Sequence, residues 1–165
     1  MLRTGDAAPE INATTADGRP FRLSGLRGSR VVLYFFPKAF TRGCAAETRG
    51  FASVYGELRQ RGVEVVGISV DDPTVQREFA EECRADFVMI GDRDRAIARS
   101  YGVLNLIGLA KRVTFFLNEN GVVQDIVQSI LPDSHLQRAR SSFLTGGGSP
   151  PSRPAPATDG SGSSA

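Results

Sequence analysis

FFPKAFTRGCAAETRGF, residues 35–51, carries Cys44 at the point where two kinds of sequence pattern meet. Before it, residues 31–36 are an unbroken run of apolar, mostly β-branched and aromatic residues, which is typical of a strand buried on both faces. After it, apolar residues recur at spacings of three and four, which predicts a helix. The stretch therefore predicts a strand that Pro37 ends, then a helix that has Cys44 in or just before its first turn.

The predicted position of Cys44 favours chemical reactivity. The first N–H groups of a helix lack intrahelical partners and, together with the helix dipole, they stabilise negative charge nearby. A thiolate at this position is a better nucleophile than an ordinary neutral thiol. The alternative interpretation is that Cys44 is a small apolar residue packed at the end of a strand.

The rest of the chain alternates between strand-like and helix-like patterns. Residues 63–70 form a second apolar run, and the order strand, helix, strand implies a parallel pair with a right-handed crossover. The further predicted elements are a hairpin at 11–23, a helix from Pro73 to about residue 85, a strand at 87–90, a helix at about 94–101, strands at 113–117 and 122–130 joined by an Asn120-Gly121 turn, and a helix to about residue 143 capped by Asp133 or Ser134.

Without the hairpin and the piece at 87–101, this order is that of the thioredoxin fold. We therefore predict an α/β, thioredoxin-like fold with an N-terminal hairpin, a strand-helix insertion and a central mixed sheet flanked by helices. The domain is predicted to cover residues 1–145. Residues 146–165, GGGSPPSRPAPATDGSGSSA, offer almost no apolar surface to bury and predict a disordered tail.

The composition argues against several classes of partner. With 20 basic and 18 acidic residues among 165, the net charge is +2 and the basic residues are scattered, so no nucleic-acid partner is predicted. The first ten residues lack the apolar core of a signal peptide, and no run of about 18 apolar residues is present. No membrane partner is predicted, and the expected location is the cytoplasm.

The chain has two cysteines, Cys44 and Cys83, and a single histidine, His135, distant from both in sequence. This set does not form a zinc motif, so neither a metal nor a cofactor is predicted. In a reducing cytosol a structural disulfide would be unusual, whereas a transient catalytic disulfide is a recognised exception. The cysteine count is therefore consistent with redox chemistry.

Pro37, Thr41 and Cys44 match the Pro-x-x-x-Thr-x-x-Cys signature of the peroxiredoxins, and PKAFTRGCAAE resembles the bacterioferritin-comigratory-protein, or PrxQ, branch of that family. Flanking segments in the matching order are Gly5-Asp6-Ala7-Ala8-Pro9, Leu26-Arg27-Gly28 and Arg112-x-Thr114-Phe115. The resemblance covers most of the chain before the tail. It implies a thiol peroxidase in which a cysteine attacks hydrogen peroxide or an organic hydroperoxide directly.

The resemblance also implies roles for individual residues. Cys44 would be the peroxidatic cysteine, which becomes a sulfenic acid, and Pro37 would shield its thiolate. The leaving oxygen would be stabilised by the Thr41 hydroxyl, by the backbone N–H groups of Gly43 and Cys44, and by the guanidinium group of Arg112. Glu47 has two open roles: a first-turn carboxylate that matches the helix dipole, or a residue that positions the site.

The chain departs from its relatives at two positions. Arg42 stands where proline is usual, and it brings a cation close to Cys44. Arg49 stands where many relatives have the resolving cysteine, so Cys83 is the remaining candidate for that role. Cys83 also follows Val75 and Phe79 at spacings of four, so a purely buried role is equally open.

Two other classes of function remain as alternatives, a thioredoxin-fold disulfide oxidoreductase and a noncatalytic binding or holdase protein. The first is disfavoured because Thr41 stands at the first cysteine position of a Cys-x-x-Cys motif, so only one of the two thiols is present. As a peroxiredoxin, the protein is expected to use a thioredoxin-like or glutaredoxin-like reductant or a low-molecular-weight thiol. It is expected to be a monomer or a weak homodimer.

Overall fold

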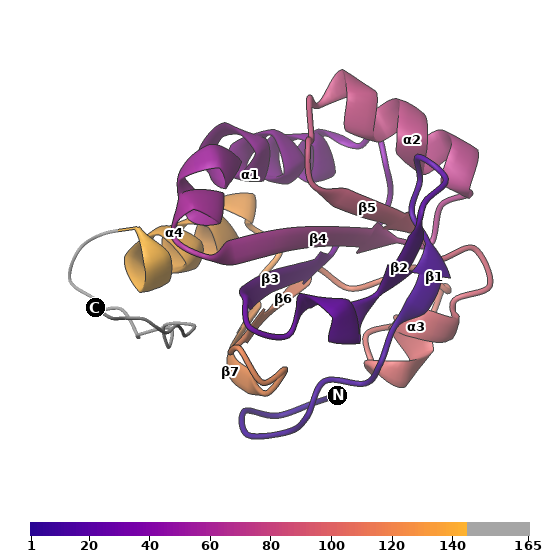
Figure 1. The fold of residues 1–165 in the computed structure, drawn as a ribbon. Coiled ribbons are helices and arrows are strands. Elements are labelled where there is room, and N and C mark those ends of the chain that lie inside the picture. The colour runs from indigo at the N-terminus through magenta and orange to yellow at the C-terminus, as the bar shows by residue number, and fades with distance from the viewer. Residues whose placement is uncertain (145–165) are drawn as a thin grey trace, which may run out of the picture.

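The computed structural model describes residues 1–144, which fold around one five-stranded sheet (Figure 1). The strand order is β5-β4-β3-β6-β7. The strands are β3 (Arg30–Phe35), β4 (Val63–Ser69), β5 (Val88–Gly91), β6 (Val113–Leu117) and β7 (Val123–Gln128). All residues of β6, and all of β3 after Arg30, are buried, as the unbroken apolar runs of their sequences predict.

The sheet is mixed, as predicted. β3 pairs in parallel with β4, with Arg30 opposite Val63, and β4 pairs in parallel with β5. β6 runs antiparallel to β3, and β7 runs antiparallel to β6. The Asn120-Gly121 turn joins these last two strands, and Gly121 has φ +76°, a conformation that glycine adopts without strain.

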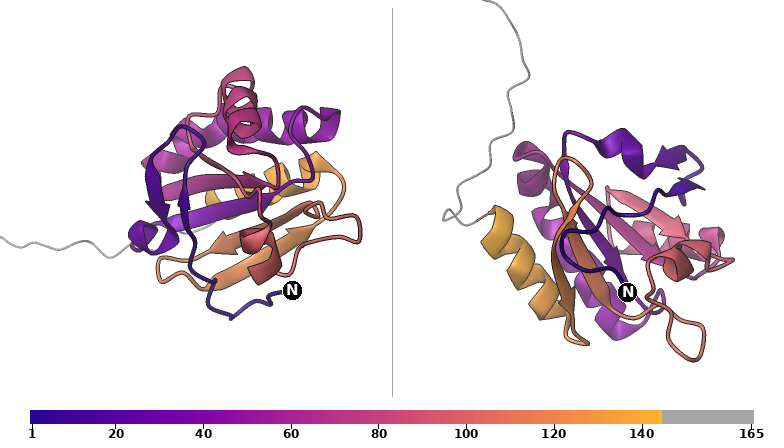
Figure 2. Two further views of the ribbon diagram at one scale, coloured as in Figure 1. Left: turned by 90° about the vertical axis from the view of Figure 1, so that its right-hand side faces the viewer. Right: turned by 90° about the horizontal axis from the view of Figure 1, so that it is seen from below.

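Helices cover one face of the sheet, while the N-terminal segment and one short helix cover the other (Figures 1 and 2). The first face carries α1 (Arg42–Gln60), α2 (Pro73–Glu82) and α4 (Pro132–Phe143). The second face carries the predicted hairpin of β1 (Asn12–Thr14) and β2 (Pro20–Arg22), the 3-10 helix η1 (Leu23–Leu26) and α3 (Ala96–Ser100). The central mixed sheet with flanking helices confirms the predicted fold class.

Consecutive residues of β3 divide between two apolar layers, because side chains alternate along a strand. Leu33 and Phe35 enter the layer beneath the hairpin and α3, where Phe35 packs against Tyr101 and Phe115. Tyr34 and Phe36 enter the layer beneath the helices, which is also the layer that contains both cysteines. Cys44 therefore lies in the layer between the sheet and these helices.

Two predicted helix ends are wrong. α4 begins at Pro132 with Leu131 as its N-cap, so Asp133 and Ser134 lie inside the first turn and neither is the cap. Pro132 explains the shift, because proline is favoured at the first helical position and needs no hydrogen-bond partner for its nitrogen. α2 ends at Glu82 rather than near residue 85, because Cys83 is its C-cap and Arg84 has φ 56°, outside the helical region.

The predicted tail at 146–165 lies outside the described residues, and the domain boundary at 145 remains a prediction. Within residues 1–144, none of the helices has the length and apolar character required to cross a bilayer.

Candidate active site

Cys44 is the third residue of α1, which places it in the first helical turn, as predicted. Its side chain is fully buried. The first helical hydrogen bond of α1 runs from the Ala45 N–H to the Thr41 carbonyl at 2.8 Å, so the N–H groups of Gly43 and Cys44 precede the helical hydrogen-bond pattern. This end of the helix carries positive partial charge.

Two neighbouring residues hold the connection between β3 and α1 in place. The Ala39 N–H donates to the Asp71 carboxylate, 2.7 Å away, which ties the connection to the segment that follows β4. Phe40 has φ 67°, a left-handed conformation that is uncommon for a bulky residue, and its ring packs against Phe79 of α2 with centroids 5.2 Å apart. The backbone that precedes Cys44 is therefore held against two other elements.

Arg112 reaches Cys44 from the neighbouring strand. It directly precedes β6, and the antiparallel register pairs Val113 with Phe35 at the end of β3, so Arg112 lies beside the start of α1. Its Nη2 is 3.4 Å from the Cys44 Sγ, and its side chain is only 10% exposed. Gly43 makes this approach feasible, because a Cβ there would lie 3.0 Å from Nη2, closer than side chains normally pack.

Glu47 holds Arg112 on the side away from the sulfur. Its Oε1 accepts from Arg112 Nη1 at 2.6 Å, and its side chain is fully buried. Because the first turn of α1 contains no acidic residue, the structure favours the positioning role of Glu47 over the dipole role. Burial raises the pKa of Glu47 to about 7, against the opposing effect of the Arg112 charge.

Thr41 is the N-cap of α1, and its side chain is exposed. Its hydroxyl donates to the Lys38 carbonyl at 2.8 Å, which leaves its lone pairs to accept a hydrogen bond from a peroxide O–H. Pro37 lines a pocket of about 480 Å³ together with Arg112, and Ile130, which is 86% exposed, lines the same pocket. The structure thus brings Pro37 and Arg112 together at one pocket and brings Arg112 to the buried Cys44 sulfur, with Thr41 one turn before Cys44.

Cys83 lies away from this pocket. As the C-cap of α2 it is 3% exposed, and it belongs to the same apolar layer as Cys44. Burial raises its pKa, which is the opposite of what a reactive thiol needs. Both cysteines are free thiols in this structure. The buried location agrees with the core interpretation, and the resolving role stays a prediction.

The sequence did not indicate any role for His135, but the structure places it directly behind the site. Its ring is fully buried, with Nδ1 2.7 Å from the Thr114 hydroxyl and 3.7 Å from Glu47 Oε2. No local sequence signal indicated this position, because His135 meets Thr114 and Glu47 only through the packing of α4 in the folded chain. No group of histidine, cysteine or acidic residues among residues 1–144 could hold a metal ion.

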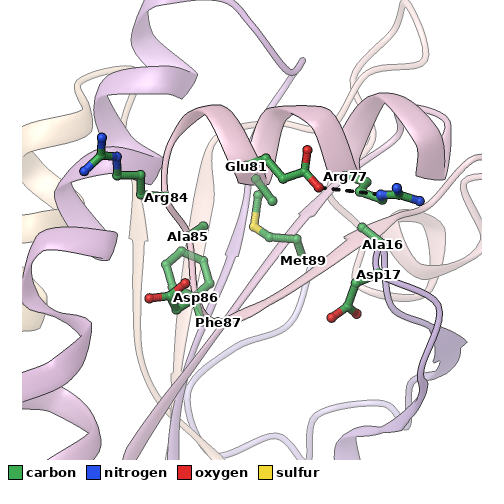
Figure 3. Close-up of a pocket in the computed structure, with 10 residues that line it drawn as sticks. Ala16, Asp17, Arg77, Glu81, Arg84, Ala85, Asp86, Phe87 and Met89 are labelled. Atoms are coloured by element: carbon green, nitrogen blue, oxygen red, sulfur yellow. Dashed lines mark ion pairs between the residues drawn. The ribbon is translucent and has the colours of Figure 1, made fainter.

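A second pocket, of about 530 Å³, lies between α2 and the turn of the hairpin (Figure 3). Met89 and Phe87 form its apolar wall, and the exposed Arg77 and Glu81 form an ion pair of 3.7 Å on its rim. None of the predicted site residues lines it.

Sequence comparison supports the resemblance. The model described as the AhpC/TSA family matches residues 4–126. The putative peroxiredoxin bcp of Coxiella burnetii is 32% identical over 142 residues, which cover 82% of this chain and 94% of that protein. Peroxiredoxin Bcp of Escherichia coli is 30% identical over 141 residues, 81% of this chain and 90% of that protein.

Solved structures agree with the fold. The crystal structure of peroxidoxin BcpB from Mycobacterium tuberculosis superposes with a TM-score of 0.79 at 33% identity, covering 86% of this chain and 96% of that one. Peroxiredoxin Q of Xanthomonas campestris has a TM-score of 0.74 at 23% identity, covering 79% of this chain and 87% of that one.

Proposed function

The chain belongs to the AhpC/TSA family, and from this premise we propose that it is a thiol peroxidase in which Cys44 reduces hydroperoxides. The Cys44 thiolate attacks one peroxide oxygen, the S–O bond forms as the O–O bond breaks, and the sulfur electron pair reduces the peroxide. Cys44 becomes a sulfenic acid, and the leaving alkoxide or hydroxide takes up a proton.

The observation that carries this proposal is the contact between Arg112 Nη2 and Cys44 Sγ at 3.4 Å, with Glu47 holding the other end of the guanidinium group. A buried cation beside the sulfur stabilises the thiolate before the reaction and the departing oxygen during it. The exposed fraction of Arg112 is 10%, so solvent screens its charge only weakly.

Backbone donors complete the proposed oxyanion site. The N–H groups of Gly43 and Cys44 lie at the start of α1, where they have no helical acceptors. Donors of this kind, held in place before the reaction, typically contribute about 3 to 4 kcal/mol each to transition-state stabilisation. Thr41 is proposed to accept the peroxide O–H, and Pro37 to form the apolar wall of the pocket.

The proposed substrates are hydrogen peroxide and organic hydroperoxides. The pocket beside Arg112 holds about 480 Å³ and combines the apolar Pro37 and Ile130 with the polar Ser129 and Gln128. It therefore has room for more than hydrogen peroxide alone. A thioredoxin-like or glutaredoxin-like protein or a small thiol is proposed as the reductant, acting in the cytoplasm on a monomer or weak homodimer.

A peroxide-consumption assay with a chemical dithiol as reductant tests the activity. The expected result is consumption that depends on protein concentration and is absent for Cys44→Ser. Reduction of insulin disulfides without peroxide consumption would instead establish a disulfide oxidoreductase. Suppression of aggregation of an unfolded client, with neither activity, would establish a holdase.

Recycling is proposed to proceed through a transient disulfide between Cys44 and Cys83. Oxidation with one equivalent of peroxide, blocking of free thiols and peptide mapping should then give a Cys44–Cys83 cross-link. Both side chains are buried, and a disulfide requires Cα atoms within about 7 Å, so α1 and the end of α2 must open locally. Opening breaks the exposed Arg49–Glu82 ion pair of 3.5 Å, a weak contact.

Glu82→Gln is the matched variant for this step, because it removes the ion pair and also removes the Glu82 charge that raises the pKa of Cys83. It should form the cross-link at least as fast as the unmodified protein. A Cys44 sulfenic acid that persists while Cys83 remains open to alkylation would contradict the two-cysteine cycle and leave Cys83 with a core role only.

A further inference from the structure

The Glu47 carboxyl group is satisfied on one side only. Oε1 accepts from Arg112 at 2.6 Å, whereas Oε2 is fully buried and has no hydrogen-bond partner among the described residues. A buried carboxylate oxygen without a donor is costly, because nothing replaces the water it has lost. The nearest titratable group on that side is His135, with Nδ1 3.7 Å from Oε2.

The hydrogen bonds of His135 determine which of its two ring nitrogens can gain or lose a proton. Nε2 is 2.9 Å from the Ser129 carbonyl, which can only accept, so Nε2 carries a hydrogen. Nδ1 is then the nitrogen that gains or loses a proton. The Thr114 hydroxyl, 2.7 Å from Nδ1, fits either state because a hydroxyl can both donate and accept.

We propose that Glu47 and His135 hold one proton between them, so that the carboxyl-imidazole pair behind Arg112 is electrically neutral in the resting enzyme. The proton resides on Oε2 or on Nδ1, and in either place Oε1 remains the acceptor for Arg112. His135 is thus a positioning residue that acts on Arg112 through Glu47.

The surroundings support a neutral pair. The charged and titratable groups that act on the pair are Arg112, which precedes β6 and affects both members, and Tyr34 of β3, which faces Glu47. Burial raises the pKa of Tyr34 well above its usual range, so that group stays uncharged. Burial also raises the pKa of Glu47 to about 7 and lowers that of His135, and both shifts disfavour charge on the pair.

The consequence for the proposed peroxidase concerns the charge of Arg112. While the pair keeps its proton, the carboxyl group orients Arg112 without neutralising it, and the whole positive charge acts on Cys44. Once the proton leaves, the Glu47 carboxylate offsets that charge. This consequence rests on the proposed function, whereas the shared proton itself is a property of the resting protein.

Proton counts from the pH dependence of unfolding test the pair directly. Between pH 5 and 6 an unfolded chain carries a proton on His135 and none on Glu47, since their ordinary pKa values are about 6.5 and about 4.3. The folded pair also holds one proton, so the unmodified protein should show no net contribution from these residues. Each single variant removes this balance.

In Glu47→Gln the folded state loses its proton while the unfolded histidine keeps one. The free energy of unfolding should therefore rise with pH relative to the unmodified protein, with a slope close to that of one bound proton. In His135→Gln the folded Glu47 keeps a proton that the unfolded state lacks, so stability should fall with pH by a similar slope. Glutamine can still donate to the Ser129 carbonyl. The double variant should return to the original slope.

If Glu47 were ionised and His135 neutral, Glu47→Gln would leave the slope unchanged, and that result would overturn the proposal. A measurement on the unmodified protein removes any dependence on how the variants fold. His135 is the only histidine in the chain, so its ring ¹⁵N signals need no assignment. At pH 6 either His135 is doubly protonated or the ¹³C signal of Glu47 is that of an acid, and the signal that reports the proton should change as the proton leaves near pH 7.

The functional arm is the rate of Cys44 oxidation by peroxide as a function of pH. The unmodified enzyme should slow as the pH rises through the shared transition, and Glu47→Gln should not. If the two proteins showed the same pH dependence of the oxidation rate while the proton counts were as predicted, the shared proton would stand and its effect on Arg112 would be overturned. Absence of any oxidation would contradict the proposed function and leave the proton counts unaffected.

Discussion

Replacing Cys44 with serine should reduce peroxide consumption on the order of 10³-fold or more, to the background of the reductant alone. A serine hydroxyl beside Arg112 is almost entirely protonated at neutral pH, and the variant cannot form a sulfenic acid. The guanidinium group, which lies 3.4 Å from the sulfur in the unmodified protein, is always protonated and cannot remove the proton of the serine hydroxyl. Stopped-flow or electrode measurements of peroxide loss check this result.

Cys83→Ser is the matched control, because it removes the other buried thiol of the same apolar layer. Its first turnover with peroxide should be as fast as that of the unmodified protein, and only later turnovers should change. If both variants slowed the first turnover equally, Cys44 would not be the distinct nucleophile that the structure indicates.

Replacing Arg112 with methionine should lower the second-order rate constant for Cys44 oxidation by about 10²- to 10³-fold, the usual effect of removing one oxyanion donor. Methionine retains most of the volume of the arginine stem, but it leaves Glu47 without its ion-pair partner. The remaining carboxyl group is fully buried, and the loss of the Arg112 charge removes the influence that lowers its pKa, so the group takes up a proton rather than staying charged.

Arg138→Met controls for the loss of an arginine. Arg138 pairs with Asp125 on the surface and is 44% exposed, so its replacement should change stability by about 0.5 kcal/mol or less and leave the oxidation rate unchanged. Thermal melting curves show whether Arg112→Met remains folded. A folded Arg112→Met protein that is oxidised at the original rate would remove Arg112 from the proposed mechanism.

The sequence was sufficient to predict the position of Cys44, because a local signal determines it. An apolar run followed by a 3.6-residue periodicity locates the junction of β3 and α1 with little help from the rest of the chain. The same is true of the β6–β7 turn at Asn120-Gly121. Arg112 was different, since its approach to Cys44 depends on the pairing of β6 with β3, and it was predicted through the family resemblance.

The environment behind Arg112 could not be predicted, because it depends on side-chain packing between distant elements. His135 on α4 and Glu47 on α1 are 88 positions apart in the sequence and meet only after α4 packs across the sheet. The local cap signals of Asp133 and Ser134 were misleading, since Pro132 started that helix earlier. The spacing of Cys83 from Val75 and Phe79 predicted a buried side chain, and the structure buries it.

The most direct test of the account is to treat the reduced Cys83→Ser protein with one equivalent of hydroperoxide in the presence of a sulfenic-acid trap, and to map the product by mass spectrometry. This variant cannot form the internal disulfide, so the primary product accumulates. The account predicts stoichiometric trapping at Cys44. Consumption of the peroxide without any modification at Cys44 would contradict it.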